Sequence, residues 1–317
     1  MAERSKRVLL YDAEKAKDIN PETLKLFQKY QVDMSIRDLS PNSIKQYNAD
    51  LMQWFIYMHD NQFNLSVKDA SDDDIEEYFF WRKQQGNNVN RQRRIMSSIS
   101  AFYKFLRKKK FITESPVEFL ERPKQGQPVI KQTFLTIEQV DELRKKLTEY
   151  GDIQLQTYIF FGLSTMARVN AMAHLRWEQI DLEDRICTDV LEKEGKIVDL
   201  YFSEEVKNLL IKLQKYRKEN NINDYGWVFV TKNTTEKECI SNGTLNDWCK
   251  KAGEMISVPT LHNHDLRHSG SNILKTMGME LQDIAELLHH ESTETTVKHY
   301  LQVDKKKIKD NKDKFVF

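Results

Sequence analysis

The sequence predicts a mainly α-helical protein with a small β-sheet, divided into two domains. The chain has 317 residues, more than one ordinary domain, and 39% of them are hydrophobic, which is enough for two cores. Only 10 glycines and 6 prolines occur, which favours helices over a turn-rich β-fold. The clearest apolar stripe in the N-terminal half has the three- and four-residue steps of a helix.

Composition also excludes several classes of protein. The cysteines Cys187, Cys239 and Cys249 are an odd number at irregular spacings, which fits neither a disulfide framework nor a metal cluster. No window reaches the roughly 18 apolar residues of a membrane span, and the N-terminus has no signal-peptide run. The 49 basic and 48 acidic residues nearly cancel, so net charge does not indicate nucleic acid. We expect a cytoplasmic protein without membrane contact, metal or cofactor.

The N-terminal half predicts a four-helix domain over residues 21–121. Residues 1–20 are polar and mixed in charge, and predict a flexible lead or a short extra helix. The four helices are expected at 22–36, 40–60, 71–85 and 90–109, the second with Ser40 as cap and Pro41 in its first turn. The apolar stripe of this second helix consists of Ile44, Tyr47, Leu51, Trp54, Phe55 and Met58. Such a stripe is typical of a bundle core.

A linker is expected at residues 122–132, because this segment has two prolines, a glycine and no apolar period. The second domain is expected over 133–304, followed by a tail at 305–317. It opens with a helix at 133–147, capped by Thr136 with Glu138 in the first turn. Further elements are expected as helices within 155–175, β-like runs within 184–202, a helix at 203–220, a short strand at 227–230 and helices from 243 to about 314.

A one-sided charge run lies between Arg82 and Lys110, where ten basic residues occur without an acidic one. A solvated helix face would give the same run, but a face laid against phosphate gains by releasing counterions. Asn and Gln side chains among the cations could reach phosphates or base edges, which favours DNA. We expect a DNA-binding surface that includes Arg82, Lys83, Arg91, Arg93, Arg94, Lys104 and Arg107.

The most informative stretch is residues 261–300, which holds several histidines, an arginine and a tyrosine. The group consists of His264, Arg267, His268, His289, His290 and Tyr300. A lone histidine or arginine on a helix is more often structural. His264 and Arg267, however, are three residues apart, hence on one helix face and able to hold the same anion. A turn at Gly278 between two helices would bring His290 back beside them.

These motifs resemble those of a known family. HDLRH at 264–268, LLHH at 287–290 and Tyr300 resemble the signature of the tyrosine recombinases, or phage integrase family: HxLRH, LGH and a tyrosine nine or ten residues later. The segment 163–183 resembles the family's first box, which makes Arg168 its first arginine. The segment 189–205 resembles the β-hairpin that carries the family's lysine, with Lys193 favoured over Lys196. Residues 21–121 are similar to its core-binding domain.

The resemblance implies a catalytic set of Arg168, Lys193, His264, Arg267, His290 and Tyr300. The tyrosine would attack a phosphodiester and form a 3′-phosphotyrosyl bond, which conserves the bond energy, so that no nucleotide or metal is needed. The two arginines would stabilise charge on the phosphate, assisted by the two histidines. His264 would also accept the phenolic proton, and Lys193 would protonate the departing 5′ oxygen. His268 and His289 are expected either to be packing residues or to support the catalytic residues from behind.

The sequence departs from the family pattern at four positions. Met166 stands where the first box has glycine, and Ala171 where it has a glutamate that helps to hold the arginine region. His289 replaces the glycine before the last histidine. The proline that often ends the hairpin strand is replaced near Tyr201.

The expected function is a site-specific DNA recombinase of the phage or mobile-element integrase type. The short N-terminal lead favours Xer-like or Cre-like action on short core sites. The alternative is a DNA-binding regulator, such as a repressor, on a recombinase scaffold, and a third reading is a nicking topoisomerase. The expected partners are double-stranded DNA and further copies of the chain, from dimer to tetramer, contacted through the tail residues Phe315, Val316 and Phe317.

Overall fold

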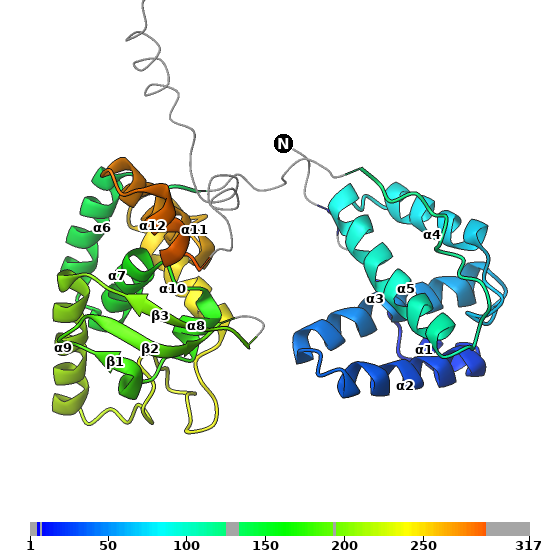
Figure 1. The fold of residues 1–317 in the computed structure, drawn as a ribbon, viewed down its shortest axis with the longest axis horizontal. Coiled ribbons are helices and arrows are strands. Elements are labelled where there is room, and N and C mark those ends of the chain that lie inside the picture. The colour runs from blue at the N-terminus through cyan, green and yellow to red at the C-terminus, as the bar shows by residue number, and fades with distance from the viewer. Residues whose placement is uncertain (1–4, 7, 125–132, 193–194, 290–317) are drawn as a thin grey trace, which may run out of the picture. The chain divides into compact units, whose positions relative to one another are not determined.

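The computed structural model describes residues 5–6, 8–124, 133–192 and 195–289. The chain divides into two compact units, unit 1 over Met1–Lys131 and unit 2 over Gln132–Phe317. Each unit has a hydrophobic core of its own. Figure 1 labels the helices and strands of both units.

Unit 1 is built of helices whose ends follow from their sequence. They are α1 (Lys15–Asp18), α2 (Pro21–Ile36), α3 (Pro41–Asn61), α4 (Asp72–Gln84) and α5 (Val89–Lys108). Side-chain oxygens cap the first turns of α2 to α5, from Asn20, Ser40, Ser71 and Asn88. Proline at the first position of α2 and α3 fits there because it lacks only an unused amide hydrogen. The four predicted helices are therefore confirmed.

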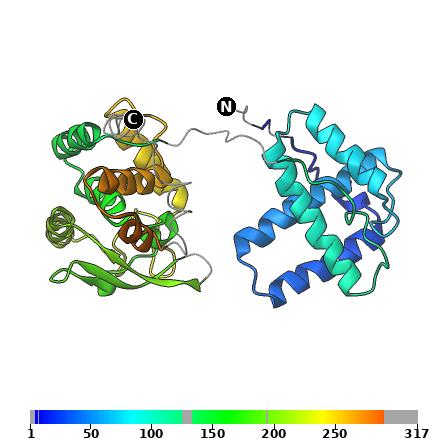
Figure 2. The same cartoon turned by 45° about the horizontal axis from the view of Figure 1, so that its top comes forward.

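The core of unit 1 contains the apolar stripe predicted for α3. Leu51, Trp54, Phe55 and Met58 are buried, and Ile44 and Tyr47 pack against the same cluster while partly buried. Helices α2 and α5 pack against α3 and against each other, and Figure 2 shows the three crossing. The helical period of the sequence thus selected the face that unit 1 buries.

The described part of the predicted N-terminal lead packs on unit 1. Ile19 is buried in its core, and Lys15 Nζ lies 2.6 Å from Asp60 Oδ2. The Lys6 amide donates to the Gly86 carbonyl at 3.0 Å. Residues 5–6 and 8–20 therefore contribute contacts to this unit, including the short helix α1.

Unit 2 combines helices with a three-stranded antiparallel sheet. Its helices are α6 (Ile137–Tyr150), α7 (Ile153–Thr165), α8 (Val169–Ala173), α9 (Glu204–Glu219), α10 (Asn242–Glu254), α11 (Asn263–Thr276) and α12 (Leu281–Leu287), with a 3-10 turn η1 (Trp177–Gln179). The strands β1 (Ile180–Asp181), β2 (Ile186–Leu191) and β3 (Ile197–Tyr201) follow one another in the sheet in chain order. The β2–β3 pair confirms the predicted β-like runs.

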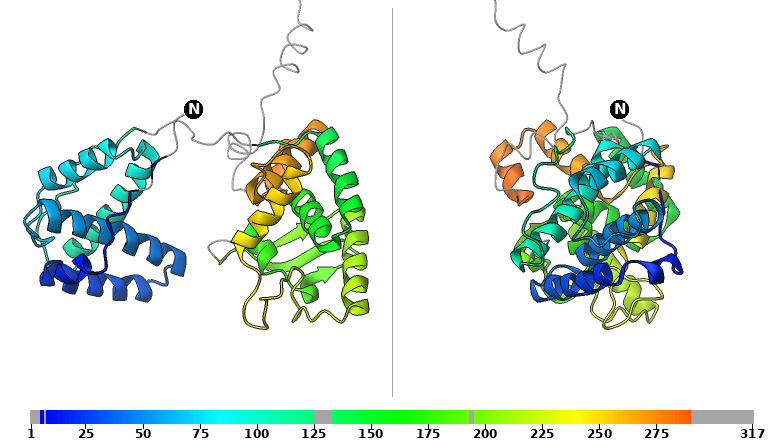
Figure 3. Two further views of the ribbon diagram at one scale, coloured as in Figure 1. Left: turned by 180° about the vertical axis from the view of Figure 1, so that it is seen from behind. Right: turned by 90° about the vertical axis from the view of Figure 1, so that its right-hand side faces the viewer.

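Helix α7 lies at the centre of unit 2. It packs against α6, α9, α10 and α11, as Figure 3 allows the reader to follow from behind. Nine of its thirteen residues are buried, which explains why its sequence is apolar almost all round. The buried helix α7 leads directly into the loop that begins at Met166.

One predicted strand is wrong. Residues 227–230 make only a single antiparallel bridge, between Trp227 and Arg176, and join no sheet. The apolar run is instead buried as an irregular segment, with the Val228 amide donating to the Leu175 carbonyl at 2.9 Å. A short apolar run fits a buried segment of any backbone form, so periodicity could not separate them.

The predicted fold class is confirmed: the chain is mainly helical, with one small sheet in the second unit. In the part of the chain that the structure describes, no helix has the length and apolar character needed to cross a membrane. All three cysteines are free, and burial raises the pKa of the Cys187 thiol to about 12.

Candidate active site

Arg168 lies at the corner between α7 and α8. Met166 ends α7 in the left-handed conformation, with φ 53°, and Arg168 is the residue that precedes α8. A non-glycine residue in this conformation needs support. Met166 has it, because its buried side chain packs against Ile284 and Leu288 of the α12 region. The methionine at the family's glycine position thus anchors the corner that presents Arg168.

Arg267 joins this corner to two other segments. Its side chain is 1% exposed, and Nη1 donates to the Met166 carbonyl at 2.6 Å. Nη2 donates to the carbonyl of Leu288, at the end of α12. A buried guanidinium that bonds two backbone carbonyls fixes the distances between α11, α12 and the α7–α8 corner. Arg168, two residues after Met166, is held close to Arg267 in this way.

His264 lies one turn before Arg267 on the exposed side of α11. Although His264 is exposed, partial desolvation of its ring lowers its pKa, and the positive charge of Arg267 lowers it further, with a smaller contribution from Arg168. The structure therefore brings His264, Arg267 and Arg168 into one electrostatic neighbourhood. The neutral imidazole that this favours at pH 7 is able to accept a proton.

His268 is a packing residue, as the sequence predicted. Its ring is 4% exposed, with its centroid 5.7 Å from that of Phe134 and 4.8 Å from that of His264. The pKa of His268 is lowered to about 4, mainly by burial and then by the charge of His264. A histidine that is neutral and enclosed serves to support α11 and the His264 ring.

His289 follows α12 and contacts the β2–β3 hairpin. Its Nε2 lies 3.1 Å from the Asp199 carbonyl, and Lys196 Nζ donates to the His289 carbonyl at 3.2 Å. Burial lowers the pKa of His289. The sequence predicted packing for this residue, and these contacts show what it packs against: the strand β3 and the lysine before it.

Glu192 is the residue of this site that sequence reasoning missed. It directly follows β2, is 3% exposed, and its Oε2 is paired with Arg168 Nη1. The same oxygen lies 3.6 Å from His289 Nδ1. Its position next to Lys193 was a signal, but a lone glutamate in a hairpin is usually exposed. The hairpin thus adds a buried carboxylate to the two arginines.

Three members of the predicted catalytic set, Lys193, His290 and Tyr300, lie outside the described residues, as do Phe315, Val316 and Phe317 of the tail. Their roles stay predictions. Among the residues that are described, no three His, Cys, Asp or Glu side chains form a group able to hold a metal ion.

Six of the seven predicted DNA-binding residues of unit 1 fall into three groups. Lys83, Lys104 and Arg107 are exposed, and Arg107 Nη1 lies 2.6 Å from Glu118 Oε2. Arg91 and Arg94 both pair with the buried carboxylate of Asp50, at 2.9 Å and 3.0 Å. Arg93 donates to the Pro123 carbonyl. These side chains reach the surface to different extents.

Arg82 corrects the prediction. Its side chain is 0% exposed and donates to Gln53 Oε1 at 3.1 Å and to the Val8 carbonyl at 3.4 Å. The guanidinium also lies over the ring of Tyr78, 5.4 Å from its centroid. A cation enclosed in this way has no surface with which to meet a phosphate, so Arg82 belongs to the core of unit 1.

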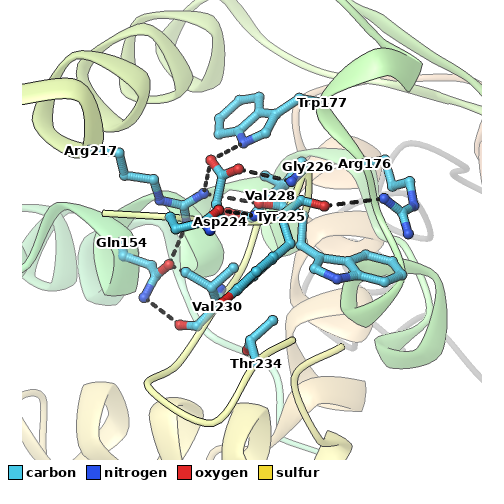
Figure 4. Close-up of polar contacts among 12 residues, drawn as sticks. Gln154, Arg176, Trp177, Arg217, Asp224, Tyr225, Gly226, Val228, Val230 and Thr234 are labelled. Carbon is cyan, nitrogen blue, oxygen red and sulfur yellow. Dashed lines mark hydrogen bonds and ion pairs between the residues drawn. The ribbon is translucent and has the colours of Figure 1, made fainter. Parts of the chain in front are cut away.

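A second polar cluster lies elsewhere in unit 2, and Figure 4 shows its hydrogen bonds. Arg217 is buried and donates to Asp224 at 3.1 Å and to the carbonyls of Trp227 and Val228 at 3.0 Å and 2.6 Å. Gln154 Nε2 donates to the Val230 carbonyl at 2.9 Å. These side chains supply the partners that a sheet would otherwise give to 227–230.

Two family profiles match the chain. The profile of the Phage integrase family matches residues 133–307, and the profile of the phage integrase N-terminal SAM-like domain matches residues 27–110. Together they cover parts of both units.

Curated relatives that match over most of their length carry related names. Tyrosine recombinase XerC of Leptospira interrogans is 28% identical over 284 residues, which covers 86% of this chain and 87% of that protein. Tyrosine recombinase XerD of Oceanobacillus iheyensis is 25% identical over 287 residues, which covers 86% of this chain and 92% of that protein.

Solved structures share the fold. The Tn1549 transposon integrase in complex with circular intermediate DNA has a TM-score of 0.67 at 16% identity, covering 90% of this chain and 98% of that one. A lambda integrase dimer bound to a COC′ core site has a TM-score of 0.65 at 16% identity, covering 92% and 81%.

Proposed function

This chain belongs to the phage integrase family, the tyrosine recombinases, and we propose that it is a site-specific recombinase that cleaves and rejoins DNA through a covalent tyrosine intermediate. The observation that carries the proposal is the convergence of Arg168 and Arg267. Arg267 bonds the Met166 carbonyl at 2.6 Å, which holds the two arginines together although they are far apart in sequence. Two always-charged guanidiniums suit the growing charge of an attacked phosphate.

In the proposed reaction the Tyr300 oxygen attacks the scissile phosphorus, and the bond from phosphorus to the 5′ oxygen breaks. His264 accepts the phenolic proton, Lys193 donates a proton to the leaving 5′ oxygen, and His290 hydrogen-bonds the phosphate. The lowered pKa of His264 supports its part, because a base must be neutral beforehand. Attack by a 5′ hydroxyl on the phosphotyrosyl bond then restores the phosphodiester and releases Tyr300.

The proposed partner is double-stranded DNA, held in part by the exposed cations Lys83, Lys104 and Arg107 of unit 1. Arg91, Arg93 and Arg94 on α5 join them through their exposed edges. Exchange of strands between two duplexes requires several protomers, and we propose that copies assemble on DNA through the tail residues 315–317. We propose that it acts on DNA in the cytoplasm.

We place the task among simple recombinations on short core sites. The named relatives XerC and XerD match this chain over most of their own length, which supports an Xer-like arrangement of two domains. The structural likeness to integrases equally supports an element of phage or transposon origin. Both versions would use the same proposed chemistry.

One observation favours a second candidate function, a DNA-binding regulator on a recombinase scaffold. Ala171 is buried and apolar at the position where the family's first box has a glutamate. Loss of that carboxylate would weaken the arginine site while leaving DNA binding intact. A repressor would need binding alone.

The test is the formation of a covalent adduct by the full chain. Duplex fragments that the protein selects from its host's genome are nicked near the cleavage point, so that the released strand diffuses away and religation fails. Wild type and Tyr300→Phe are compared on a denaturing gel, with the exposed Tyr216→Phe of α9 as matched control. We expect an adduct with wild type and Tyr216→Phe, and none with Tyr300→Phe.

Each other outcome has a definite meaning. Tight binding without an adduct in any protein would reject the recombinase and favour the regulator. If the protein forms an adduct and relaxes supercoiled plasmid, yet yields no recombinants from paired sites, it would instead be a topoisomerase.

A further inference from the structure

The carboxylate of Glu192 has no role in the family pattern stated above, yet it sits in the middle of the site. Its backbone is fixed, because its amide donates to the Lys196 carbonyl at 2.8 Å across the hairpin. Its Oε2 pairs with Arg168 and lies 3.6 Å from His289 Nδ1. A side chain held at both ends in this way has a defined position.

Glu192 lies on the far side of Arg168 from solvent. The Glu192 side chain is 0% exposed, whereas that of Arg168 is 31% exposed. A carboxylate that competed with DNA for the arginine would have to be reachable from the surface. Glu192 is therefore placed to hold the arginine from behind, which leaves the outer edge of the guanidinium for a phosphate.

Position 171, where the family's first box has a glutamate, carries no charge in this chain because the residue is alanine. Ala171 is the third residue of α8, the helix that Arg168 precedes, and it is 1% exposed and packs in the apolar core of unit 2. The third residue of a helix is placed to reach back to the residue that precedes the helix, so a longer acidic side chain at position 171 would extend toward Arg168. Glu192 reaches it from the hairpin instead.

We propose that Glu192 is a positioning residue that aims Arg168 at the scissile phosphate, in place of the carboxylate that Ala171 lacks. The inference rests on the proposed function. Glu192 also offsets the positive charge of Arg168, Arg267 and Lys196, which would otherwise repel one another before DNA arrives. Its contribution is therefore to the geometry of the attacked phosphate and not to the attraction of DNA.

Titration of the His289 ring can detect the charge of Glu192 without any DNA cleavage. Its Nε2 donates to the Asp199 carbonyl, so the neutral ring turns the lone pair of Nδ1 toward Glu192. Burial lowers the pKa of His289, the hydrogen bond to the Asp199 carbonyl opposes this, and Arg267, Lys196 and Arg168 lower it further. Because Glu192 Oε2 lies 3.6 Å from His289 Nδ1, removal of the carboxylate charge is expected to lower the pKa of His289.

The experiment compares Glu192→Gln, which keeps the shape and removes the charge, with Glu192→Asp, which keeps the charge. Glu183→Gln is the matched control, because Glu183 is exposed in the turn before β2 of the same sheet. Single-turnover cleavage and DNA affinity are measured separately. We expect Glu192→Gln to slow cleavage by about 10- to 100-fold. Its Kd for DNA is expected to stay within about twofold of wild type or to tighten.

Glu192→Asp is expected to cleave at an intermediate rate, and Glu183→Gln at the wild-type rate. Cleavage by Glu192→Gln at the wild-type rate would overturn the proposal, and so would a loss that appears only in Kd. If Glu192→Gln melts early, a folded Glu192→Asp that cleaves no faster than Glu192→Gln would contradict the role of the charge.

Nuclear magnetic resonance of the His289 ring separates this inference from the proposed function. If wild type forms no adduct, the proposed recombinase fails, while the contact is still tested by titration. A lower pKa of His289 in Glu192→Gln would support the positioning contact, and an unchanged value would reject it.

Discussion

The two arginines of the candidate site differ in what surrounds them. Arg267 is enclosed and donates hydrogen bonds to two backbone carbonyls, so it holds the segments of the site together in addition to its proposed contact with the phosphate. Arg168 keeps an exposed edge and is supported by one carboxylate. Replacing either by lysine would not be conservative, because an ammonium cannot bond two partners at fixed directions.

At the residue scale, His268 predicts how stability depends on pH. Burial lowers its pKa from 6.5 to about 4, so between these values the unfolded chain binds a proton that the folded chain refuses. The contribution of His268 to the free energy of unfolding is therefore fully present above pH 6.5. It is lost as the pH drops, by up to about 1.4 kcal/mol per pH unit for one such group. Urea unfolding at pH 7, 6 and 5 measures this slope.

His268→Gln is expected to reduce that slope by about 1 kcal/mol per pH unit. The same change at the exposed His174 of unit 2 is expected to leave it as in wild type. An identical slope in His268→Gln and wild type would show that the buried ring is not what refuses the proton.

At the element scale, the crossing of α7 and α11 sets the distance between the two arginines. Gly270 on α11 lies so close to α7 that a Cβ there would be 2.2 Å from the Leu163 carbonyl oxygen and 2.9 Å from Met166 Cγ. No side chain can be accommodated at these distances unless the helices separate. The glycine therefore keeps Arg267 within reach of Met166.

Gly270→Ala is accordingly expected to lower the free energy of unfolding by at least about 2 kcal/mol. It is also expected to reduce adduct formation, since Arg267 would move away from the α7–α8 corner. Gly243→Ala on α10 is the control, because its Cβ would meet only Ser241 Oγ at 3.6 Å. That variant is expected to be neutral or up to about 1 kcal/mol more stable. Equal stability of the two variants in urea would refute the close crossing.

At the scale of the whole molecule, the two units have separate cores. The two hydrophobic clusters, as far as the described residues define them, share no member. A unit with its own core can fold alone, and its unfolding need not depend on the other.

We expect a fragment of residues 1–124 and a fragment of residues 133–317 each to unfold cooperatively, as measured by circular dichroism during heating. A fragment of residues 1–88 is the control: it lacks α5, whose Ile95, Ile99 and Phe102 complete the core of unit 1. It should not fold, because large apolar surfaces of α2 and α3 would stay in water. A cooperative transition in this control, or none in the two longer fragments, would contradict the division.

Sequence by itself determined most of the helices, the β2–β3 hairpin and the family to which the chain belongs. Caps such as Ser40 and Thr136, and the apolar steps of α3, act within a few residues, so the helices could be predicted from local pattern. The motifs around Arg168 and Arg267 likewise identified both arginines, because each motif is a continuous run.

Only the tertiary structure decided which charges are buried and what holds them. Arg82 entered the core of unit 1 because Gln53, 29 residues away, bonds it, and Glu192 became part of the site because Arg168, 24 residues away, pairs with it. Residues 227–230 do not need to join a sheet, because Arg217 and Gln154 donate hydrogen bonds to their carbonyls. The physical reason is common to all three: the free energy of burying a polar group depends on partners that the fold supplies from a distance.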